Sequence, residues 1–125
     1  QEEAQIPLNT VDNLDSFLAD VQQGHWDAVM SVVATLKLPQ RLMIDLYEQL
    51  VIELLELREL DTARQVLRTA PAMIALQERD GTRHQKLEAL AGRPYFDPRD
   101  AYTEGQTKER RRNFLAEQLK AEVSV

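Results

Sequence analysis

The stretch that most constrains this chain is residues 39–58, PQRLMIDLYEQLVIELLELR. Apolar side chains occupy so many of its positions that on a helix they would cover most of the circumference. One narrow stripe is polar, with members three or four residues apart: Asp45, Glu48, Gln49, Glu53 and Glu56. A helix with so thin a polar stripe needs neighbouring helices on its other sides. The stretch therefore predicts the buried central helix of an all-α domain.

Further helices are expected on both sides of this stretch. Apolar periodicity, together with capping and breaking residues, predicts helices at about 13–23, 25–36, 61–69, 71–77, 82–91 and 108–121, and a short turn at 97–102. Short connections favour antiparallel neighbours. The expected fold is a compact array of antiparallel helical hairpins without a sheet. Residues 12–69 would form its core, 70–125 would complete the same domain, and 1–11 would be a linker.

Four side chains are expected to be nearly fully buried in this fold. Leu46, Leu50 and Leu54 lie on the central helix, and Trp26 is the only tryptophan in the sequence. Trp26 comes early in a predicted helix beside other apolar residues, so it is interpreted as part of the core rather than as a binding anchor.

The residues give no sign of catalytic or metal chemistry. The chain has no cysteine, which excludes a disulfide framework and a thiolate zinc site. It also lacks a glycine-rich phosphate loop and an HExxH motif, and its two histidines, His25 and His84, are far apart in sequence. The central stretch is too acidic to span a membrane. We therefore expect no enzyme, cofactor, metal or membrane partner.

Charge is distributed unevenly along the chain. Residues 1–62 contain 12 acidic and 3 basic side chains, a net of −9, whereas residues 63–125 contain 9 acidic and 12 basic ones, a net of +3. The acidic half argues against general nucleic-acid binding, in which phosphate contacts dominate the affinity. The basic run of Lys108, Arg110, Arg111 and Arg112 is either a solvated helix face or a contact for RNA or an acidic partner. We expect this run to be largely exposed.

The acidic stripe of the central helix has two possible roles. Asp45, Glu48, Glu53 and Glu56 are either the solvated edge of a buried helix or the rim of a groove with an apolar floor. Such a groove would suit a peptide with hydrophobic anchors flanked by lysine or arginine. The hypothesis from sequence is that a partner protein docks there.

Several runs also resemble a known family. Residues 8–62 look like a CTLH segment, the helical module that commonly follows a LisH motif. More specifically, the chain resembles the Smu family of WD-repeat splicing factors in these runs: LNTVD at 8–12, ATLKLP at 34–39, IDLYEQLVIELLELREL at 44–60, YFDPRDAY at 95–102, KERRR at 108–112 and AEVSV at 121–125. The runs are collinear and span nearly the whole chain.

The resemblance implies a role that the residues alone do not show. In that family a LisH motif precedes this segment and a WD-repeat propeller follows it, so Gln1 to Glu3 would be the tail of a LisH motif that can form homodimers. The family acts in the nucleus as a spliceosome scaffold in pre-mRNA splicing, together with the protein RED. The alternatives are a CTLH module of a ubiquitin-ligase scaffold, against which YFDPRDAY and AEVSV speak, and an RNA-contacting helical module.

Overall fold

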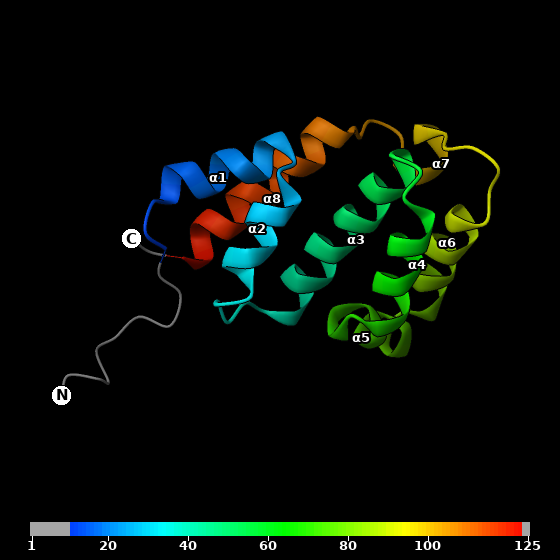
Figure 1. The fold of residues 1–125 in the computed structure, drawn as a ribbon, viewed down its shortest axis with the longest axis horizontal. Coiled ribbons are helices and arrows are strands. Elements are labelled where there is room, and N and C mark those ends of the chain that lie inside the picture. The colour runs from blue at the N-terminus through cyan, green and yellow to red at the C-terminus, as the bar shows by residue number, and fades with distance from the viewer. Residues whose placement is uncertain (1–10, 124–125) are drawn as a thin grey trace. The chain divides into compact units, whose positions relative to one another are not determined.

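The computed structural model describes residues 11–123, and within them it has eight helices and no strand (Figure 1). The predicted all-α class is therefore confirmed. Residues 1–10 and 124–125 lie outside the description, and with them most of the run at 8–12, the end of the run at 121–125 and nearly all of the predicted linker. No helix among the described residues is long and apolar enough to cross a membrane.

The chain divides into two compact units, which are described separately. The central unit is Gln40–Lys108, and the terminal unit combines the described residues 11–39 and 109–123. This division differs from the expected one, in which residues 12–69 form the core and 70–125 complete it. The first two helices are instead grouped with the last helix rather than with the central one.

The terminal unit contains α1 (Leu14–Gln23), α2 (Trp26–Val33) and all but the first residue of α8 (Lys108–Glu122). Asn13 caps α1 by accepting a hydrogen bond from the Ser16 backbone N–H at 3.0 Å. The helix ends at Gly24, whose φ of 75° is left-handed. The buried side chains of its three helices recur with helical spacing: Phe17, Val21, Trp26, Val29, Val33, Leu115, Ala116 and Leu119.

The connection between α1 and α2 favours glycine because of its left-handed backbone. The Arg112 guanidinium of α8 lies so close to Gly24 that a Cβ at that position would overlap it. The flexible Arg112 side chain can move away from such a Cβ, but the positive φ makes an L side chain at position 24 unfavourable in any case.

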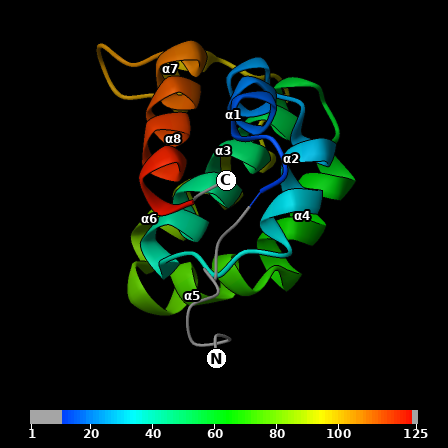
Figure 2. The same cartoon turned by 90° about the vertical axis from the view of Figure 1, so that its left-hand side faces the viewer.

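The central unit contains α3 (Gln40–Glu56), α4 (Leu60–Thr69), α5 (Pro71–Arg79), α6 (Gly81–Ala91) and α7 (Pro98–Ala101). α3 packs against α4, α5 and α6, and α5 lies across one end of α3 and α4 in both ribbon views (Figure 1, Figure 2). The core residues come from all five helices: Ile44, Val51, Ile52, Leu55, Ala63, Leu67, Ala72, Met73, Leu76, Leu87, Leu90, Ala91 and Ala101. Within this unit α3 is the central helix.

The burial of α3 differs from the expected pattern in one respect. Leu46 and Trp26 are buried, as predicted, but Leu50 and Leu54 are only partly buried. They belong to a row four and three residues apart, Met43, Tyr47, Leu50 and Leu54, that stays partly exposed along its length. The row through Leu42, Leu46, Gln49 and Glu53 is buried instead. Both rows contain apolar residues, so the sequence pattern of α3 did not show which row the neighbouring helices would bury.

Candidate binding surface on the central helix

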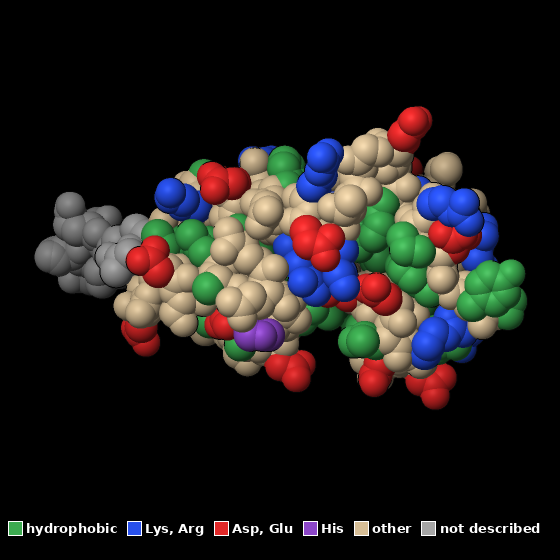
Figure 3. Space-filling model, turned by 90° about the horizontal axis from the view of Figure 1, so that it is seen from above, with side chains coloured by type: hydrophobic (Ala, Val, Ile, Leu, Met, Phe, Trp, Pro, Cys, Tyr) green, Lys and Arg blue, Asp and Glu red, His purple; other side chains and the backbone are tan. Residues whose placement is uncertain are grey.

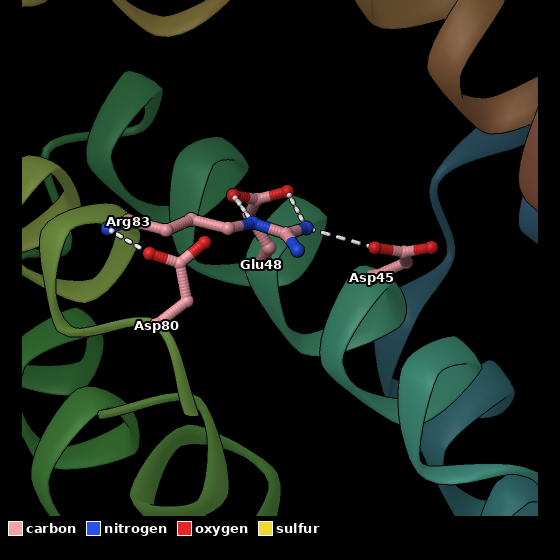
Figure 4. A network of polar contacts seen from close by, with 4 residues as sticks. All are labelled: Asp45, Glu48, Asp80 and Arg83. Atoms are coloured by element: carbon pink, nitrogen blue, oxygen red, sulfur yellow. Dashed lines mark hydrogen bonds and ion pairs between the residues drawn. The ribbon is translucent and has the colours of Figure 1, made fainter. Parts of the chain in front are cut away.

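The first two carboxylates of the acidic stripe are bound by a cation from another helix. Arg83 of α6 donates from Nε to Glu48 Oε2 at 2.8 Å and from Nη2 to Glu48 Oε1 at 2.6 Å. The same Nη2 donates to Asp45 Oδ1 at 2.8 Å. Figure 4 shows the guanidinium lying between the two carboxylates. A fork of this kind matches the geometry of a carboxylate and is among the stronger charged hydrogen bonds.

The start of α6 explains why Arg83 reaches α3. Asp80 caps this helix, and its Oδ1 accepts a hydrogen bond from the Arg83 backbone N–H at 3.2 Å (Figure 4). The cap fixes Arg83 in the first turn of α6, next to α3. The hydrogen bond that Arg83 donates to Glu48 raises the pKa of Arg83 above its already high usual value, burial opposes the shift, and the hydrogen bond to Asp45 raises the pKa further. The guanidinium therefore stays charged and offsets one of the two negative charges of Asp45 and Glu48.

Glu53, the third carboxylate of the stripe, is buried rather than solvated. Only 5% of it is exposed. Gln49, also buried, donates from Nε2 to Glu53 Oε2 at 2.9 Å and to the Tyr102 hydroxyl at 2.9 Å. The expectation that Gln49 and Glu53 lie on a solvent-exposed stripe of α3 is wrong. Both side chains are buried, and a hydrogen-bonded network satisfies their polar groups.

Glu56 is the stripe carboxylate that remains exposed, and it lies beside the first residue of the basic run. Lys108 Nζ donates to Glu56 Oε1 at 3.3 Å. The sequence interpretation had assigned these two residues to separate sites. The structure brings them together at the end of α3, as a surface pair of small energetic value.

The basic run is less exposed than expected. Arg110 is exposed, but Lys108, Arg111 and Arg112 are partly buried. Arg111 stacks over the Phe114 ring with 5.0 Å between its Cζ and the ring centroid, and Arg112 lies against Gly24. Two of the four cations thus have structural contacts within the terminal unit. On the face drawn in Figure 3, positive and negative side chains are interspersed rather than gathered by sign.

The sequence interpretation missed one surface feature at the end of the central unit. Leu57 and Tyr95 are large side chains that are 70% and 73% exposed. Arg58 follows Leu57 directly and has a left-handed φ of 64°. Its Nη2 donates a hydrogen bond to the Pro94 carbonyl at 3.0 Å, which joins it to the segment that carries Tyr95. The signal was the end of α3 at Glu56, which is followed two residues later by an arginine at the position where glycine is usual.

The two histidines do not come together in a catalytic or metal site. The His25 Nδ1 lies 3.2 Å from Asp20 Oδ1, and the buried His84 ring contacts the Leu67 carbonyl through Nε2 at 3.1 Å. Among residues 11–123 no group of three or more histidine or acidic side chains could hold a metal ion. The polar groups of the central unit are arranged chiefly to join its helices.

Comparison with known proteins supports one of the resemblances. No family model matches the chain. The WD40 repeat-containing protein smu1 of Dictyostelium discoideum is 43% identical over 123 residues, which is 98% of this chain. The chain spans about a quarter of that protein, 23% of its length.

Proposed function

We propose, from the confirmed resemblance of this chain to the Smu family of WD-repeat proteins, that it serves as a non-catalytic interaction scaffold in nuclear pre-mRNA splicing. The observation that carries the proposal is 43% identity sustained along 98% of the chain. Identity at this level over so long a helical segment extends beyond the apolar pattern that any helical domain shares.

The helical architecture fits a binding role. Arg83 of α6 is hydrogen-bonded to Glu48 of α3, and Gln49 of α3 is hydrogen-bonded to Tyr102. These hydrogen bonds hold the segments of the central unit together. Helices held in this way present a stable surface to a partner at low conformational cost. The proposed partners are a RED-like protein and other spliceosomal proteins.

The partner-binding proposal does not depend on the acidic stripe of α3. Asp45 and Glu48 already share Arg83, and Glu53 is buried. A partner with lysine or arginine would have to compete with Arg83 for the two carboxylates. This favours a docking surface elsewhere on the helices.

The test is capture of partners from a nuclear extract by the full chain carrying an affinity tag. We expect spliceosomal proteins, including a RED-like protein, to be enriched, and the purified partner to co-elute with the chain in gel filtration. Enrichment of ubiquitin-ligase subunits in their place would overturn the proposal.

Nuclease treatment of the same extract separates direct binding from binding through RNA. Capture that survives nuclease supports a protein scaffold. Capture that is lost with nuclease, and that falls steeply with salt, would indicate the RNA-contacting alternative. The matched control replaces Arg110 and Arg111 with alanine, which should leave protein capture unchanged.

A further inference from the structure

A groove of about 430 Å³ lies between α1 and α2 in the terminal unit. Asn13, Ser16, Phe17 and Asp20 line it from α1, because residues three, four and seven apart share one helix face. The end of α2 and the turn after it line the other side, with Ser31, Val32 and Thr35. Cavities that hold ligands are commonly of this size.

The groove has an apolar floor and an acidic rim. Phe17 is buried and Val32 is half-buried, and they are flanked by the Ser16 and Thr35 hydroxyls. Asp12 and Asp20 are the charged side chains that line it. His25 lies 3.2 Å from Asp20 and is largely exposed. It neutralises Asp20 only when it is protonated.

The local charge and the end of α2 act in the same direction. Residues 11–39, which carry the groove, contain four aspartates and one lysine, whereas residues 109–123 of the same unit add three acidic and four basic side chains. The last turn of α2 has no basic residue, so the partial negative charge of its terminal carbonyls has no counterpart within that turn. A cation in the groove would therefore be attracted by Asp12, Asp20 and the end of this helix.

We infer that this groove docks a basic segment of a protein partner, in which one arginine or lysine reaches Asp12 and a second reaches Asp20, while a small apolar side chain rests on Phe17 and Val32. The inference deepens the proposed scaffold function and rests on it. It places the acidic docking surface on α1 and α2, because the corresponding carboxylates of α3 are already bound by Arg83. Apolar contact would supply most of the affinity and the carboxylates would set orientation and on-rate.

The probe is a fluorescein-labelled peptide of four Leu-Arg repeats, measured by fluorescence anisotropy against the full chain at low salt. Asp12→Asn together with Asp20→Asn should weaken binding about tenfold. The matched control is Asp15→Asn with Asp27→Asn, which removes the same charge from the first turns of α1 and α2, outside the groove. We expect it to change the affinity less than about twofold. A peptide of Leu-Glu repeats should not bind.

Two further measurements locate the site. In ¹⁵N-labelled protein, the amides of Ser16, Ser31 and Thr35 should shift with the Leu-Arg peptide. Ser16→Arg places a cation in the groove and should remove binding while the helical circular dichroism is retained. Equal weakening by both aspartate pairs, or shifts spread over the whole chain, would overturn the inference and indicate only general attraction to a negatively charged protein.

The inference and the proposed function fail in different ways. If the Asp12/Asp20 variant and Ser16→Arg capture the nuclear partner as well as the unchanged chain does, the groove is not its docking site and the scaffold proposal stands. If the Leu-Arg peptide binds the groove but the chain captures no splicing protein from extract, the scaffold proposal fails and the site remains.

Discussion

Glu53 and Glu56 lie one helical turn apart on α3, but their surroundings differ completely. Glu53 is buried and hydrogen-bonded to Gln49, whereas Glu56 is exposed beside Lys108. Two glutamates with the same chemistry are therefore expected to contribute differently to the stability of the fold. Neither position can be assessed from its place in the acidic stripe alone.

Reversing each charge should reveal this difference. Glu53→Lys places an ammonium group in a buried site and should lower the free energy of unfolding by about 3 kcal/mol or more. Glu56→Lys, the control on the same helix, should cost less than about 1 kcal/mol. Urea denaturation of both variants checks this. Equal losses would mean that Glu53 is not buried as described.

Arg58 is the one described non-glycine residue with a positive φ, and its side chain holds the segment that leads to Tyr95. Arg58→Gly and Arg58→Ala both remove the hydrogen bond to the Pro94 carbonyl, but only alanine retains the unfavourable backbone. Arg58→Ala should therefore be less stable than Arg58→Gly by about 1 kcal/mol. Thermal melts that rank the two variants in the opposite order would contradict this account.

At the scale of helices, α3 and α6 are joined by the Arg83 fork. Arg83→Ala leaves Asp45 and Glu48 without their cation and should cost about 1–3 kcal/mol, toward the lower end because all three side chains are partly solvated. Adding Asp45→Asn and Glu48→Gln should recover part of the loss. A double-mutant cycle with no recovery would mean that the fork adds nothing beyond packing.

Packing along α3 predicts a second contrast between helix faces. Leu55 is fully buried, so Leu55→Ala should cost about 2–5 kcal/mol. Leu50 is partly exposed, and Leu50→Ala should cost clearly less, because fewer contacts are lost and water can fill the space. Denaturant melts of the two variants give the ranking. Equal costs would show that the two faces are covered to the same extent.

At the scale of the whole molecule, most of the described ion pairs lie at the surface, either within one helix or turn or between neighbouring ones. Such pairs are screened by salt, and so is the repulsion from the net charge of −6. Raising sodium chloride from 0.05 to 0.5 M should therefore change the unfolding free energy by less than about 1 kcal/mol. A larger loss in urea melts would show that ion pairs dominate stability.

The sequence by itself determined the helical class, most helix ends and the burial of Leu46 and Trp26. These follow from local rules: apolar periodicity, the Asn13 cap and the glycine after α1. The resemblance to the Smu family was also recognisable from the sequence alone, and the 43% identity to one of its members supports it.

Only the tertiary structure decided which polar residues remain available to a partner. Arg83 is 35 residues from Glu48 and 38 from Asp45, and Tyr102 is 53 from Gln49. Periodicity describes one helix and contains no information about the side chain that a second helix brings to it. The same limit hid the groove between α1 and α2, because a groove forms only when two faces meet. Its two aspartates, Asp12 and Asp20, were visible in the sequence, but the opposite wall of Ser31, Val32 and Thr35 comes from the end of α2 and the turn after it.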